Sequence, residues 1–203
     1  MSPIRLFAYM AMLGFASLSS APQSIAQDKS KSKKDGKKKP SPVPYERTII
    51  YNNLSFKISS PGLDSGNSVK ISPVGLKADN SAVVIPLNGV VREILSGDID
   101  GDSWPELIVW ETAHDKVHQV IHGYTVNNGR FLIPFTTTNT NNKDAIAEGY
   151  GGYDEYNIGN NVLMQRFPIM KGGKPTKKTR QLQYSLLSTD DAKQLWFDKS
   201  FEF

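Results

Sequence analysis

From residue 45 to the C-terminus, apolar residues occur in short runs separated by clusters of Gly, Pro and Asn. No window of a dozen residues holds a clean 3.6-residue apolar period, whereas residues 54–58 (Leu-Ser-Phe-Lys-Ile) alternate strictly, as a half-buried strand does. The turn Asn127-Asn128-Gly129 between two apolar runs is typical of a β-hairpin. The pattern predicts strands at 45–59 (one long strand, or a pair broken at 52–53), 69–71, 82–85, 90–95, 107–110, 117–126, 130–133, 154–158, 162–167, 180–187 and 194–203, with a loop at 172–179.

These short strands predict an all-β fold, a single antiparallel β-sandwich-like domain with an acidic loop between two of its strands. Proline is expected to end two of the strands, at Pro73 and Pro86. The chain contains no cysteine, so disulfides cannot stabilise the fold and an ordinary hydrophobic core must do so.

The first 44 residues differ from the rest of the chain. Residues 1–26 have the pattern of a secretory signal peptide, with Arg5, an apolar core at 6–18 and the small-residue site Ser24-Ile25-Ala26. Residues 27–44 are rich in lysine and serine and are expected to form a disordered linker. An uncleaved membrane anchor is the alternative, but the apolar core is shorter than the roughly 20 residues of a membrane span. We therefore expect a β-rich domain at 45–203 and a periplasmic or secreted location.

The basic charge of the chain belongs to its N-terminal part. Eight of the 24 basic residues and two of the 20 acidic residues precede residue 45, which leaves 16 basic and 18 acidic residues in the predicted domain. A nucleic-acid-binding fold needs a basic patch of its own, and none is evident in this net charge. We expect no nucleic acid partner and no membrane span, and leave a homodimer open.

The segment from Ser96 to Leu107 places three aspartates at alternate positions, with a glycine after the second and a glutamate four residues after the third. This order matches the oxygen ligands that one loop wraps around a hard cation. The alternative is a polar hairpin whose aspartates accept backbone N–H groups. Three crowded carboxylates repel one another without a counter-charge, which favours Ca²⁺. The predicted ligands are the side chains of Asp98, Asp100, Asp102 and Glu106 and the backbone carbonyl of Trp104.

The other candidate groups are less specific. His114, His118 and His122 are spaced four apart, but on a strand such residues lie about 13 Å from one another, too far for one zinc ion. The block 148–156 combines glycine with three tyrosines, and is either a turn before an aromatic strand or a protein-recognition surface. The sequence has neither a cysteine nor a Gly-x-Ser-x-Gly nucleophile motif, and we expect no enzymatic activity.

Two blocks of sequence together resemble a known family. The first is residues 89–110, with the Asp98-Ile99-Asp100-Gly101-Asp102 loop; the second joins Gly149-Tyr150-Gly151-Gly152-Tyr153-Asp154 to an Arg166-Phe167-Pro168 strand and a Thr179-Arg180 strand ending near Tyr184. In this order they resemble the periplasmic inhibitors of invertebrate-type lysozyme (the PliI family) and their relatives, over residues 80–187. The Ser-Gly-x-Tyr inhibitory loop of that family is not matched, since residues 111–119 contain neither glycine nor tyrosine.

The resemblance implies a secreted, sandwich-like protein whose partner is a lysozyme and which acts by occluding the enzyme's active-site cleft. The alternative is a calcium-stabilised cell-envelope module that binds another protein or a glycan. In either case we expect the partner to contact the segment after the acidic motif and the glycine–tyrosine block. The predicted contact residues are His114, Asp115, Lys116, His118, Tyr150 and Tyr153.

Overall fold

The computed structural model describes residues 43–63, 65–137, 148–188 and 192–203, and these form twelve β-strands and no helix. Among them no helix is long and apolar enough to cross a membrane. The strands are β1 (Tyr45–Tyr51), β2 (Leu54–Ser60), β3 (Asn67–Val74), β4 (Val83–Leu87), β5 (Gly89–Gly97), β6 (Glu106–Ala113), β7 (Gln119–Asn127), β8 (Phe131–Phe135), β9 (Glu155–Gly159), β10 (Val162–Lys171), β11 (Lys174–Ser188) and β12 (Lys193–Glu202).

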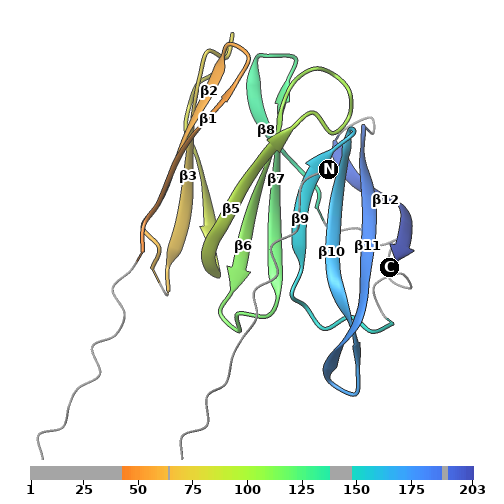
Figure 1. Cartoon of the computed structure of the whole chain (residues 1–203). Helices are drawn as coiled ribbons and strands as arrows, with labels where there is room; N and C mark the ends of the chain where they lie inside the picture. The colour runs from red at the N-terminus through yellow and green to blue at the C-terminus, as the bar shows by residue number, and fades with distance from the viewer. Residues whose placement is uncertain (1–42, 64, 138–147, 189–191) are drawn as a thin grey trace, which may run out of the picture. The chain divides into compact units, whose positions relative to one another are not determined.

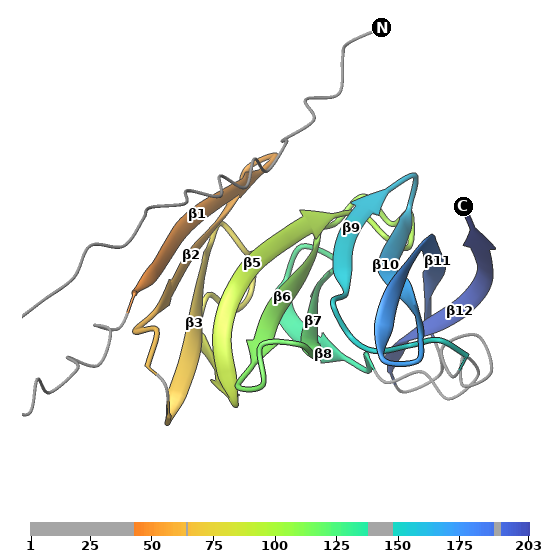
Figure 2. The ribbon, with the colours of Figure 1, turned by 60° about the horizontal axis from the view of Figure 1, so that its bottom comes forward.

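The strands form three sheets of four consecutive strands each, and within each sheet neighbouring strands pair antiparallel. Sheet A is β1-β2-β3-β4, sheet B is β5-β6-β7-β8 and sheet C is β9-β10-β11-β12, so each sheet is a simple meander. Figures 1 and 2 show sheet B between the other two. The first two strands are separate and join at Asn52-Asn53, where Asn52 has a positive φ of 51°, a conformation that asparagine tolerates better than most residues.

Two hydrophobic cores lie on the two faces of sheet B. The first contains Phe56 and Ile71 of sheet A together with Leu107 and Val109 of β6. The second contains Ile108 of β6 together with buried residues of sheet C, such as Leu163 and Leu182. Because alternate residues of β6 enter different cores, the strand is buried without interruption from Glu106 to Glu111. The all-β, sandwich-like prediction is therefore confirmed, with three layers.

Three details of the prediction are wrong. Pro73 and Pro86 lie within β3 and β4, one residue before each strand ends, and are paired there with Phe56 of β2 and Ser68 of β3. β4 is an edge strand, where a sheet tolerates proline, and β3 pairs with β4 only up to Ile71. The loop expected at 172–179 is a hairpin, because β11 begins at Lys174 and pairs with β10 directly after Gly172-Gly173. The polar sequence hid this strand, which buries none of its first five side chains.

Candidate functional site

The acidic loop between β5 and β6 is folded by hydrogen bonds from its own backbone. Asp98 accepts from the amides of Gly101 at 2.7 Å and Ser103 at 2.9 Å, and Asp102 accepts from the amide of Trp104 at 2.8 Å. Gly101 and Ser103 have positive φ values of 78° and 70°, which turn the loop back on itself. The loop therefore contains the aspartate–amide hydrogen bonds of the polar-hairpin alternative.

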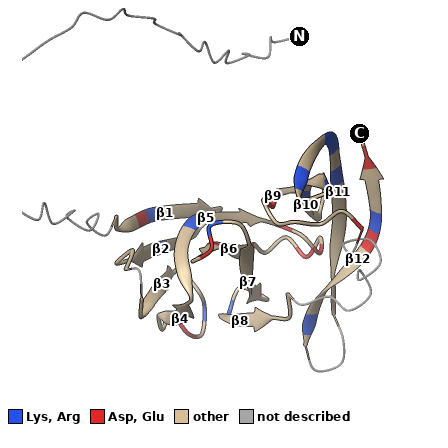
Figure 3. Cartoon of the chain, turned by 90° about the horizontal axis from the view of Figure 1, so that it is seen from below, with Lys and Arg blue, Asp and Glu red and all other residues tan. Residues whose placement is uncertain are grey.

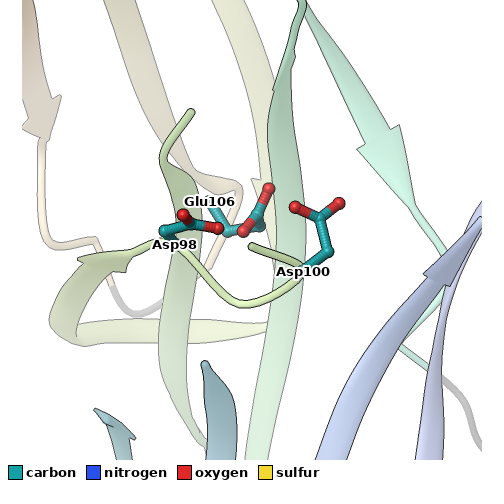
Figure 4. A group of neighbouring side chains, drawn as sticks. All are labelled: Asp98, Asp100 and Glu106. Carbon is teal, nitrogen blue, oxygen red and sulfur yellow. The ribbon is translucent and has the colours of Figure 1, made fainter. Parts of the chain in front are cut away.

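Three carboxylates converge beneath this turn. Asp98, Asp100 and Glu106 each offer an oxygen, and these oxygens lie within 4.8 Å of one another. Figure 4 shows the three side chains at the loop. Glu106 is fully buried and accepts from the Ile99 amide at 2.7 Å and the Thr125 hydroxyl at 2.6 Å. Burial raises the pKa of Glu106 to about 7, although these two hydrogen bonds lower it. The three residues are oxygen ligands of the kind that Ca²⁺ prefers, but Ca²⁺ needs about six to eight oxygens in all.

A positive charge already neighbours this cluster. The ammonium group of Lys193, at the start of β12, pairs with Asp100, lies 3.0 Å from Asp102 and donates to the Thr125 hydroxyl at 3.2 Å. Burial lowers the pKa of Lys193, but hydrogen bonds to the two aspartates outweigh this effect and the pKa lies above its ordinary value. Lys193 thus supplies the counter-charge that the sequence analysis assigned to a cation. Only the fold could have revealed it, since it lies 93 residues from Asp100 in sequence.

The carboxylate of Asp102, a further predicted ligand, is not part of the converging group. Asp102 directs one oxygen to its own loop and the other to Lys193. The indole of Trp104 packs against the first core, and its ring lies so close to Gly129 that a Cβ there would come within 2.4 Å of it. Of the four predicted carboxylate ligands, the structure brings together those of Asp98, Asp100 and Glu106.

The predicted partner-binding residues lie at the other end of β6. Its first residue, Glu106, belongs to the acidic cluster, and its last residue, Ala113, begins the β6–β7 turn, about 23 Å away along an extended strand. In this turn Asp115 accepts from the amides of Val117 and His118 at 2.9 Å, and its second oxygen lies 2.5 Å from Nδ1 of the His118 ring. The hydrogen bond from the His118 side chain lowers the pKa of Asp115 to about 2. His114, Asp115, Lys116 and His118 are all exposed.

The glycine–tyrosine block forms a second loop before β9, anchored by a buried polar chain. Tyr150 donates to Asp154 at 2.7 Å, Gln165 donates to the other oxygen of Asp154 at 2.6 Å, and Tyr184 donates to Gln165 at 2.7 Å. Burial raises the pKa of Asp154, against the effect of the two hydrogen bonds that it accepts. The Tyr150 ring also packs edge-on against Phe167 at 5.0 Å, so Tyr150 supports the loop, while Tyr153 is 52% exposed.

These two loops form one surface, here called the two-loop surface (residues 113–118 and 148–154). The Tyr153 amide donates to the Val117 carbonyl at 2.8 Å, and the His118 and Tyr150 rings lie 6.3 Å apart. Gly152 fits closely against Val117, because a Cβ at Gly152 would lie 2.7 Å from it. The structure therefore brings all six predicted contact residues to one place.

No family model matches the chain, and no match to a curated protein or to a solved structure was found.

His122 lies apart from the other histidines and forms a pair that the sequence analysis missed. Its Nε2 atom lies 2.8 Å from Oε2 of Glu111, across the β6–β7 pair. The Glu111 side chain is 2% exposed and that of His122 is 28% exposed. Among the described residues, Oε1 of Glu111 is the one buried side-chain polar atom without a hydrogen-bond partner. The pair therefore rests on a single hydrogen bond.

Proposed function

We propose that this chain is a secreted or periplasmic, non-enzymatic binding protein that inhibits a lysozyme by covering its active-site cleft. The observation that carries the proposal is the hydrogen bond from the Tyr153 amide to the Val117 carbonyl, 2.8 Å long. It joins two segments that were assigned to partner binding from separate features of the sequence. Such a surface acts by shape and polar contacts, and needs no chemistry of its own.

The construction of the two-loop surface supports this role. The Asp115–His118 pair orders the first loop, and the buried hydrogen-bonded chain behind Tyr150 orders the second. Loops that are rigid before binding lose less conformational entropy on association, which raises affinity. Exposed Tyr153, held at a φ of 61° between these supports, has the size and chemistry of an interface anchor.

The direct test is inhibition of invertebrate-, chicken- and goose-type lysozymes by the purified full chain. We expect inhibition of at least one enzyme at micromolar protein or below. Tyr153→Asn, which keeps a residue that tolerates positive φ, should weaken inhibition at least tenfold. Val84→Ser on β4, which is exposed outside the two-loop surface, is the matched control and should inhibit like the wild type. If the folded wild type inhibits none of the three enzymes, the proposal is overturned.

The converging carboxylates favour a second candidate, a calcium-stabilised envelope module with another ligand. Asp98, Asp100 and Glu106 would hold the ion, whose role would be to brace the β5–β6 connection, in competition with Lys193. An ion that binds the native state raises its stability, so melting in millimolar Ca²⁺ and in chelator separates the alternatives. A higher melting temperature with Ca²⁺, combined with no lysozyme inhibition, would favour this candidate. Equal melting temperatures would remove it.

A further inference from the structure

The β10–β11 hairpin is a narrow arm that extends past the strands on either side of it. β9 pairs with β10 only up to Arg166, and β12 pairs with β11 only from Arg180 onward. Within the described residues, no other strand pairs with the tip of the arm, whose further backbone contacts are from Met170 to Gly149 and between Thr179 and Phe203. Figure 1 shows the arm beyond the ends of β9 and β12. Gly172 and Gly173, with φ values of 57° and 74°, form the two-residue turn, in the conformation of a type I′ hairpin.

This arm carries a local concentration of positive charge that is not evident from the net charge of the whole domain. The sequence has no acidic residue between Glu155 and Asp190, and six of the domain's 16 basic residues lie in that interval. Lys171, Lys174 and Lys177 are exposed and form no ion pair with any other described residue. Figure 3 shows the basic residues gathered on the arm. The fold therefore has a basic patch, contrary to the prediction from its net charge.

The two lysines at the turn form a matched pair. Lys171 and Lys174 are direct cross-strand partners, so their side chains leave the same face of the ribbon with Cβ atoms about 5 Å apart. Each ammonium group ends a flexible four-carbon stem, so the pair can reach two acceptors separated by roughly 5 to 10 Å.

The arm contacts the two-loop surface close to its turn, at Met170. The Met170 amide donates to the Gly149 carbonyl at 2.6 Å, and a Cβ at Gly151 would lie 2.6 Å from the Met170 side chain. A partner that covers the two-loop surface would therefore also contact the arm, which projects beside that surface. A projecting basic ribbon is complementary to a concave acidic surface.

We propose that this arm enters the lysozyme cleft and that Lys171 and Lys174 pair with the two catalytic carboxylates. The inference rests on the proposed function and names the element that does the occluding. Glycoside hydrolases hold two carboxyl groups about 5 to 9.5 Å apart across the scissile bond, a span that the lysine pair matches. Ammonium–carboxylate pairs in a cleft closed to water are charge-assisted hydrogen bonds, and they occupy the groups that protonate and attack the substrate.

The test is a double-mutant cycle with the full chain and the lysozyme that it inhibits best. The inhibitor variants are Lys171→Gln with Lys174→Gln, and the enzyme variant carries amides in place of both catalytic carboxylates. Binding is measured by calorimetry, since the enzyme variant is inactive. Lys57→Gln with Lys70→Gln, two exposed lysines on neighbouring strands of sheet A, is the matched control.

The arm variant should bind wild-type enzyme roughly 30-fold more weakly, and the control should bind like the wild type. Against the amidated enzyme, the arm variant and the wild type should bind within about threefold of each other, because the charges no longer meet. If the arm variant loses the same affinity for both enzymes, or loses none for either, the proposed role of the arm is overturned. The proposed function would still stand in that case, because the wild type inhibits the enzyme. Absence of any inhibition by the wild type would overturn both. Heparin binding that depends on the same lysines, with no coupling to the carboxylates, would assign the arm to polyanions instead.

Discussion

The Glu111–His122 pair allows a quantitative test of how the centre of the fold is stabilised. We expect His122→Leu to destabilise the protein, because Oε2 of Glu111 would lose its only hydrogen bond while Oε1 already has none. Removing the partner of a buried carboxylate leaves that group uncompensated, which costs about 3 to 5 kcal/mol. His122 is 28% exposed, so water can approach from that side, and the lower figure of about 3 kcal/mol applies.

The assay is urea unfolding of the full chain at pH 7, followed by circular dichroism. In a thermal melt, the same loss of about 3 kcal/mol would lower the melting temperature by about 6 to 12 °C for a domain of this size. The double variant Glu111→Leu with His122→Leu removes both polar partners and should be close to the wild type in stability, or above it. The reasoning is refuted if the single variant loses less than about 1 kcal/mol, or if the double variant loses as much as the single one.

Three further predictions follow from other contacts. Lys193→Met should lower the free energy of unfolding by about 3 kcal/mol without calcium, because Asp100 and Asp102 lose their counter-charge. Millimolar Ca²⁺ should raise the melting temperature of the variant more than that of the wild type, and equal responses would contradict this. Gly123→Ala should cost about 1 to 3 kcal/mol in thermal melts, because a Cβ there would lie 2.2 Å from the Phe135 ring, whereas Gly159→Ala meets only an ordinary 3.4 Å contact and should be nearly neutral. By NMR, Asp115 should titrate with a pKa of about 2, and His118→Ala should return the pKa of Asp115 toward its ordinary value. Because the pKa is lowered in the folded state, the ordering of the loop is complete above the ordinary pKa and is lost as the pH falls through about 2.

The sequence predicts the strands well because alternation and turn residues are local signals. Asn127-Asn128-Gly129 marks the β7–β8 hairpin, and the alternation at 54–58 marks β2, with Leu54, Phe56 and Ile58 buried. The three-layered arrangement is less evident. Its one signal is the continuous apolar run of residues 107–110, which is typical of a strand buried on both faces.

The parts that the sequence could not predict depend on contacts between distant residues or on patterns that resemble loops. Lys193 reaches Asp100 across 93 residues, and no local pattern encodes that approach. Residues 172–179 look like a loop because they are polar and contain two glycines and a proline, yet the backbone pairing of a ribbon does not require apolar side chains. The two-loop surface was predicted in part. Its residues were identified from the sequence, but the contact between its two loops depends on the packing of sheet C against sheet B.

The position of sheet B also determines how the molecule loses its structure. Both cores need β6, whereas sheets A and C each contribute to only one. Local opening of an outer sheet leaves a two-sheet remainder with an intact core, but opening of β6 removes both cores at once. Backbone amides of β6 should therefore exchange with solvent deuterium only through global unfolding, and those of β1 and β12 through smaller, more frequent openings.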